Sequence, residues 1–151
     1  MSWFTAPPAV TAPAVQRGIA TVAHERIGAA MSFIQSGAVG INSGKPENIL
    51  QLAQRLRTEL GIISSSNVEQ SILYKDASNQ NRQEVGNRLK MIRAYLEGAK
   101  NKAENKRLLE RGVTTEKSAL IKDIQQDFIQ VLYNLRALER LLLQSERQRV
   151  A

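Results

Sequence analysis

The chain has 151 residues, enough for one domain that buries roughly two-thirds of the surface its unfolded form exposes. It contains no cysteine and one histidine, His24, which excludes disulfides, thiolate nucleophiles and metal sites that need two histidines. The net charge is +7, and residues 82–122 hold eleven basic side chains against five acidic ones, so the middle of the chain carries most of the charge.

Residues 1–13 contain three of the four prolines among Ala, Val and Thr, which predicts an extended arm. The start, Met1 to Phe4, lacks the basic residues and apolar run of a signal peptide. The most apolar stretch, Ile27 to Ile41, is too short and too interrupted to span a bilayer, which takes roughly 20 apolar residues. We therefore expect neither a signal peptide nor a full transmembrane helix, and the cytoplasm is one expected location.

Residues 14–61 predict a helix rich in small residues, to about Ala38, and then a turn at Gly40–Lys45. A short amphipathic helix follows from Pro46 and stops at Gly61. Small side chains let helix backbones approach closely, in tightly packed bundles or in membranes. The alternative is a frayed helix that runs into a glycine loop. The residues proposed for close packing or membrane contact are Gly28, Ala29, Ala30, Ser32, Phe33 and Gly37.

Ser66 and Glu69 fit a capping box that starts another helix. The following stretch, from Lys75 to Gln83, has almost no apolar residue, so it is either a solvated helical segment or a bend.

Two heptad seams follow, with apolar residues at alternating steps of three and four. The sequence between the two seams predicts the end of one helix and the start of the next: Arg111 is a basic residue in a last turn, Gly112 stops the helix, and Thr114 caps the following one. The predicted connection has about four residues. The first seam narrows at Ala99 and Ala103, and extra leucines widen the second seam, as expected for a helix in a bundle. The proposed core or oligomer seam comprises Val85, Leu89, Ile92, Leu96, Ile121, Ile124, Phe128, Val131, Leu135, Leu138 and Leu142.

The sequence therefore predicts an all-α single domain. Residues 62–151 form a long antiparallel, coiled-coil-like hairpin, and shorter helices and the arm precede it.

A cluster of cations surrounds the predicted tip of the hairpin, interrupted by Glu104, Glu110 and Glu116. Such a surface suits nucleic-acid phosphates or anionic lipid headgroups. The alternatives are an ordinary solvated surface or acidic protein partners. The cations proposed for anion contact are Lys100, Lys102, Lys106, Arg107, Arg111, Lys117 and Lys122.

No arrangement of residues predicts an enzyme, a cofactor or a small-molecule substrate. The layout resembles the small internal, or ejection, proteins in the heads of short-tailed bacteriophages. The resemblance rests on Met1 to Phe4, the Ala- and Gly-rich segment up to Gly40, and the polar helices that end in Gln144 to Arg149. It implies a ring or tube that contacts membrane or DNA, and it adds the virion as the second expected location.

We therefore expect a non-enzymatic structural subunit of a homo-oligomeric ring, tube or filament, with other assembly proteins as partners. The alternatives are a secretion-system or flagellar-type filament component, an adaptor or chaperone that binds a partner helix, and a non-specific DNA-binding protein.

Overall fold

The computed structural model describes residues 19–62 and 67–150. The described part contains no strand, which confirms the predicted all-α class. The predicted arm, residues 1–13, lies outside it. In chain order the elements are α1 (Ile19–Asn42), α2 (Pro46–Leu60), the 3-10 turn η2 (Val68–Gln70), α3 (Ile72–Asp76), α4 (Arg82–Ala103), α5 (Lys106–Arg111) and α6 (Thr114–Val150).

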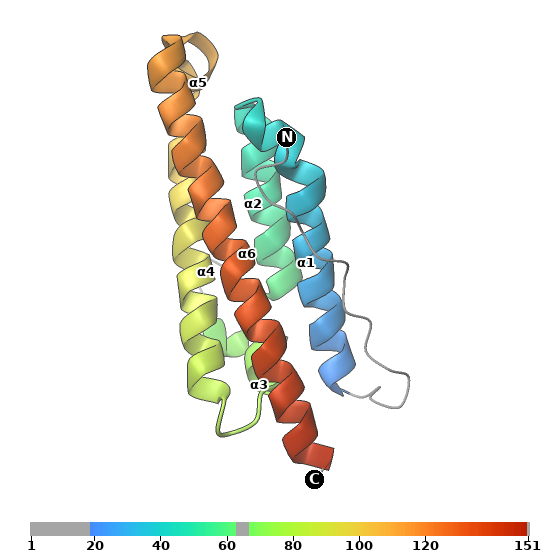
Figure 1. Ribbon diagram of the computed structural model, residues 1–151. Coiled ribbons are helices and arrows are strands. Elements are labelled where there is room, and N and C mark those ends of the chain that lie inside the picture. Colours follow the sequence, from blue (N-terminus) through green and yellow to red (C-terminus); the bar gives the residue numbers. More distant parts are fainter. Residues whose placement is uncertain (1–18, 63–66, 151) are drawn as a thin grey trace.

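Four long helices, α1, α2, α4 and α6, pack side by side. Each packs against two of the others: α1 against α2 and α6, and α4 against α2 and α6. The four alternate in direction along the long axis of the molecule (Figure 1), as in an up-down-up-down four-helix bundle. The prediction of shorter helices before the hairpin is wrong for α1, which has 24 residues against 22 in α4.

The bundle has an aliphatic core, to which all four long helices contribute fully buried side chains. α1 supplies Ile27 and Ile34, and α2 supplies Ile49 and Leu56. The α4 and α6 seams face these residues, so apolar burial holds the helices together. The buried seam residues are Val85, Leu89, Ile92, Leu96, Ala99 and Ala103 on α4, and Ile124, Phe128, Val131, Leu135, Leu138 and Leu142 on α6; Ile121 is partly buried against them.

Polar contacts join every neighbouring pair of long helices and fix how the helices sit along one another. Three of the four contacts are partly buried, and a polar group that must find its partner there penalises other registers; the fourth, between α6 and α1, is exposed. The contacts are Arg26 to the Glu59 carbonyl for α1 and α2, Gln125 to Asn42 for α6 and α1, Arg57 to Glu97 for α2 and α4, and Arg88 to Asn134 for α4 and α6.

The turn between α1 and α2 begins later than predicted, because α1 continues through Gly40 to Asn42. Glycine does not break the helix there; a Cβ on Gly40 would lie 3.0 Å from the Asn48 Cβ, so its lack of a side chain lets α2 approach. Gly44 makes the turn with φ of +65°, and Gly61 ends α2 with φ of +68°, which confirms the predicted stop.

The connection between α2 and α4 contains η2 and α3 in place of the helix predicted to start at Ser66. Ser66 lies outside the described residues, and Ser71 caps α3 instead, because its Oγ accepts a hydrogen bond from the Leu73 N–H at 3.2 Å. The same hydroxyl donates to the Leu60 carbonyl at 2.6 Å, which ties the start of α3 to the end of α2. The polar stretch after Lys75 is a bend, since α3 ends at Asp76 and α4 begins at Arg82.

The connection between α4 and α6 is longer than the predicted four residues. α4 ends at Ala103, and the short helix α5 occupies the corner. The side chain of Leu109 is buried in the core, with 1% of its surface exposed, and α5 is the helical turn that places it there. Gly112 ends α5 as predicted, and a Cβ there would lie 2.4 Å from the Leu108 carbonyl oxygen.

Candidate functional site: interaction surfaces

The small residues predicted on α1 point in three directions. Ala30 lies in the core, whereas Phe33 and Gly37 line the contact with α2, where a Cβ on Gly37 would lie 2.8 Å from Leu52. The others leave a surface that faces away from the bundle. We call this surface the α1 outer face; it comprises Gly28, Ala29, Ser32, Gln35, Ser36 and Val39.

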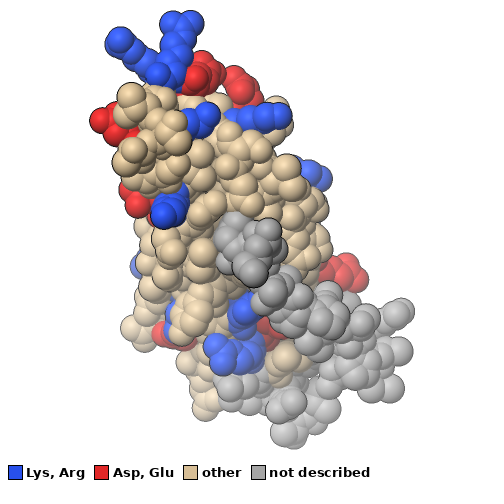
Figure 2. Space-filling view, turned by 45° about the horizontal axis from the view of Figure 1, so that its top comes forward, with Lys and Arg blue, Asp and Glu red and all other residues tan. Residues whose placement is uncertain are grey.

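The α1 outer face carries no charge along most of the helix, because the last charged residue before it is Arg26 and the next is Lys45. The Ser36 hydroxyl donates to the Ser32 backbone carbonyl at 2.7 Å, so this polar group of the face already has a hydrogen-bond partner within α1. Val39 is 75% exposed, the most of any large apolar side chain in the described part. Figure 2 shows a broad area without Lys, Arg, Asp or Glu beside the charged end of the molecule.

A groove of about 240 Å³ lies beside the α1 outer face, between α1 and α2. The Arg55 guanidinium stacks 4.0 Å from the Phe33 ring centroid and forms one wall. Gly37 and Gly40 also line the groove, and because glycine has no side chain only their backbone atoms do so. The lining residues are Phe33, Ser36, Gly37, Gly40, Asn48, Gln51, Leu52 and Arg55.

The seven predicted tip cations divide into two groups. Lys100 lies 3.9 Å from Glu97 and 4.0 Å from Glu104, and Lys102 lies 2.8 Å from Asp127, so these two cations already have acidic partners. The other five are exposed or half-exposed, and Figure 2 shows Lys and Arg side chains projecting from this end among acidic ones. The remaining five are Lys106, Arg107, Arg111, Lys117 and Lys122.

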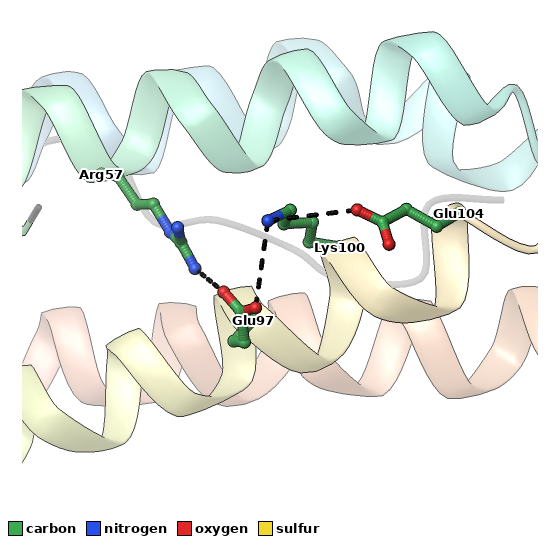
Figure 3. Close-up of polar contacts among 4 residues, drawn as sticks. All are labelled: Arg57, Glu97, Lys100 and Glu104. Carbon is green, nitrogen blue, oxygen red and sulfur yellow. Dashed lines mark hydrogen bonds and ion pairs between the residues drawn. The ribbon is translucent and has the colours of Figure 1, made fainter. Parts of the chain in front are cut away.

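Arg57 and Glu97 join α2 to α4 (Figure 3), and Lys100 sits on the far side of the Glu97 carboxylate. The hydrogen bond from Arg57 lowers the pKa of Glu97 below its ordinary value, and burial opposes that change. The Arg57 side chain is 7% exposed and that of Glu97 is 44% exposed, so the pair lies at the edge of the core.

Lys102 and Asp127 join α4 to α6 near the α5 end. Burial raises the pKa of Asp127, and the hydrogen bond from Lys102 only partly offsets that effect. Sequence reasoning missed this pair and the buried Asn134, although a signal exists. Asp127 and Asn134 are one heptad apart, and each immediately precedes a seam residue, which places polar groups at the edge of the α4 contact.

No helix in residues 19–62 or 67–150 combines the length and the apolarity that crossing a bilayer requires. In the same residues no cluster of three His, Cys, Asp or Glu side chains is placed to hold a metal ion. Comparison with protein-family models, curated proteins and solved structures found no match to this chain.

Proposed function

We propose that the chain is a non-catalytic structural subunit that assembles with copies of itself through the α1 outer face. The uncharged character of this face supports the proposal. Because residues 82–122 carry +6 of the net charge of +7, contact through α4, α5 or the start of α6 would bring like charges together. The α1 outer face avoids that repulsion over the stretch between Arg26 and Lys45.

Gly28 gives a second reason to expect contact from outside. Among the described residues, a Cβ at this position would meet no atom within 4 Å, so packing within residues 19–62 and 67–150 does not require glycine there. Glycine in a helix costs about 1 kcal/mol relative to alanine. A close approach by another backbone at Gly28 would account for a glycine that packing in this part of the chain does not require.

The size of the face sets the expected strength of assembly. The face runs from Gly28 to Val39, which is roughly 18 Å of helix, and a strip ~10 Å wide along it covers about 180 Å². Stable interfaces bury about 800 Å² on each partner, so the groove beside α1 must contribute as well. We expect weak, concentration-dependent association, of the kind that gains strength when many copies join.

In this proposal α4 and α6 form the coiled-coil-like hairpin that supports α1 and α2. The seam that the sequence offered for oligomer contact is occupied within the subunit, so assembly uses the outer surfaces instead. A ring, tube or filament of such subunits agrees with the role that the resemblance to phage internal proteins implies.

Sedimentation velocity over a range of protein concentrations tests the proposal. Val39→Lys should hold the protein as a monomer at concentrations where the wild type associates, a shift of at least about tenfold in dissociation constant. Ala94→Lys is the matched control, because Ala94 is exposed on α4 and the charge change is the same. A wild type that stays monomeric throughout, or equal effects of the two substitutions, would refute the proposal.

A second candidate is contact of the α5 end with a phosphate-rich polymer, supported by the exposed Lys106, Arg107 and Arg111. Replacing these three with Glu should abolish binding to a DNA duplex and its dependence on salt. Lys102→Glu is unsuitable as part of the test, because it would place two carboxylates at the Asp127 site. Unchanged binding after the triple substitution would exclude this end as the contact.

A further inference from the structure

The outer surface between α4 and α6 contains a hollow that neither the core nor the proposed assembly uses. It has a volume of about 230 Å³ and is lined by Glu84, Arg88, Ala137, Arg140 and Leu141. The chain of contacts α1–α2, α2–α4, α4–α6 and α6–α1 places this hollow on the opposite edge of the bundle from the α1–α2 groove. A ligand here would therefore leave the α1 outer face free.

Arg88 is held in position at the hollow. Its Nε donates to the Glu84 carboxylate at 3.0 Å, and its Nη1 donates to the Asn134 Oδ1 at 3.1 Å. Asn134 is fully buried and donates in turn to the Gln130 carbonyl at 2.8 Å, so its amide is fixed as well. A guanidinium has five N–H donors, and a fixed one can receive a carboxylate with little loss of side-chain entropy.

Two exposed large apolar side chains lie within one helical turn of lining residues, one on α4 and one on α6. Met91 lies one turn after Arg88 on α4 and is 41% exposed. Tyr133 lies one turn before Ala137 on α6 and is 58% exposed. The hollow and its surroundings therefore combine cationic groups with exposed apolar ones, which is the combination that receives an acidic amphipathic helix.

We propose that the α4–α6 hollow is a docking site for an acidic amphipathic helix of a partner protein. Arg88 and Arg140 receive carboxylates of that helix, and Met91 and Tyr133 contact its apolar side chains. Charge decides between occupants: the lining holds two arginines and one glutamate, and Glu84 already pairs with Arg88, so Arg140 leaves the hollow with a charge of +1. A second copy of this chain carries a net charge of +7, whereas an acidic helix brings the opposite charge. A bare phosphate polymer would leave the two apolar side chains without a partner.

The test uses a fluorescein-labelled helical peptide with Leu along one face and Glu along the other, and a matched peptide with Gln in place of Glu. Fluorescence anisotropy should show saturable binding of the Glu peptide and at least about tenfold weaker binding of the Gln peptide. Arg140→Gln should weaken the Glu peptide about tenfold. Lys122→Gln, the same charge change on an exposed residue of α6 far from the hollow, should change the affinity less than about twofold.

Backbone amide NMR shifts locate the peptide on the protein. The largest changes should fall on Arg88, Met91, Tyr133 and Ala137. Absence of saturable binding, equal affinity for the two peptides, equal effects of Arg140→Gln and Lys122→Gln, or shifts centred on another helix would each overturn the proposal. Sedimentation without peptide reports self-association separately, so failure of either proposal is distinguishable from failure of the other.

Discussion

The turn between α1 and α2 allows two contributions to stability to be separated by experiment. Gly44 has φ of +65°, and a Cβ there would lie 2.7 Å from the Ile121 Cδ1 atom. Gly61 has nearly the same φ, +68°, but within residues 19–62 and 67–150 the nearest atom to a Cβ there would be the Ser71 Cα, at 3.4 Å. Alanine at Gly61 therefore meets the strain of a left-handed backbone alone, and alanine at Gly44 meets that strain together with a steric overlap.

The expected costs follow from these distances. A left-handed conformation costs a residue with a Cβ about 1–2 kcal/mol, and the reduced entropy of the unfolded chain returns part of it. Overpacking adds about 1 kcal/mol here, the low end of its usual range, because the overlapped atom is the end of the partly buried Ile121 side chain, which can move. We expect Gly61→Ala to lower the free energy of unfolding by about 1 kcal/mol and Gly44→Ala to lower it by about 2 kcal/mol. Urea denaturation followed by far-UV circular dichroism measures both values.

Ile121→Val provides the control, because it deletes the Cδ1 atom that the new Cβ would overlap. Gly44→Ala should cost about 1 kcal/mol less in the Ile121→Val background than in the wild type. The cost of Gly61→Ala should be the same in both backgrounds. If Gly44→Ala costs no more than Gly61→Ala, or if Ile121→Val brings no relief, then the α1–α2 turn does not pack against α6 as described.

Three further predictions concern the core and the ion pairs. Leu135→Asp should unfold most of the protein, because a charge replaces a fully buried side chain at a cost of at least ~4 kcal/mol. Tyr133→Asp should preserve the circular dichroism spectrum, because Tyr133 lies two residues earlier, on the exposed side of α6. Glu97→Gln should destabilise the protein at neutral pH, and the difference from wild type should shrink as the pH falls below the ordinary Glu value of 4.5, because the lowered pKa of Glu97 gives stability that is lost on protonation. Asp127 should show the opposite trend, because its raised pKa means that folding favours the protonated carboxyl. The free energy of unfolding of the wild type, relative to that of Asp127→Asn, should be highest below the ordinary Asp value of 3.8. It should fall as the pH rises through the raised pKa. Urea denaturation at a series of pH values measures both trends, and parallel curves would contradict them.

The sequence was sufficient to predict the helical class and the buried residues of α4 and α6, because a repeated step of three and four residues reports one face of a helix. It was less informative about glycines. Gly40 reads as a helix breaker in a local sequence, but it lies inside α1 because Asn48 packs against it. That role depends on a neighbour on another helix, which local sequence does not reveal.

The candidate surfaces were harder to predict for the same reason. Lys102 and Lys106 look alike in the sequence, yet Lys102 is paired with Asp127, 25 positions away, and Lys106 is exposed. Arg88 reads as one more cation on a basic helix, and only the contact with Asn134, 46 positions away, shows that its guanidinium is fixed. Counting charges along the chain therefore overestimates how many cations at the α5 end are available to bind an anion. It also gives no sign of the α4–α6 hollow.

The form of the α1 edge bears on how assembly would begin. Val39 projects beside the groove, whose lining includes its neighbours Ser36 and Gly40. A two-fold contact between α1 faces would insert the Val39 of each copy into the groove of the other, so both projections and both grooves are filled. A head-to-tail contact would fill one groove per interface. Because the strip on α1 alone is small, the arrangement that uses both grooves is favoured, and the first associated species should be a dimer. Larger particles then require a second contact, and the α5 end and the α4–α6 edge are the surfaces left to supply it.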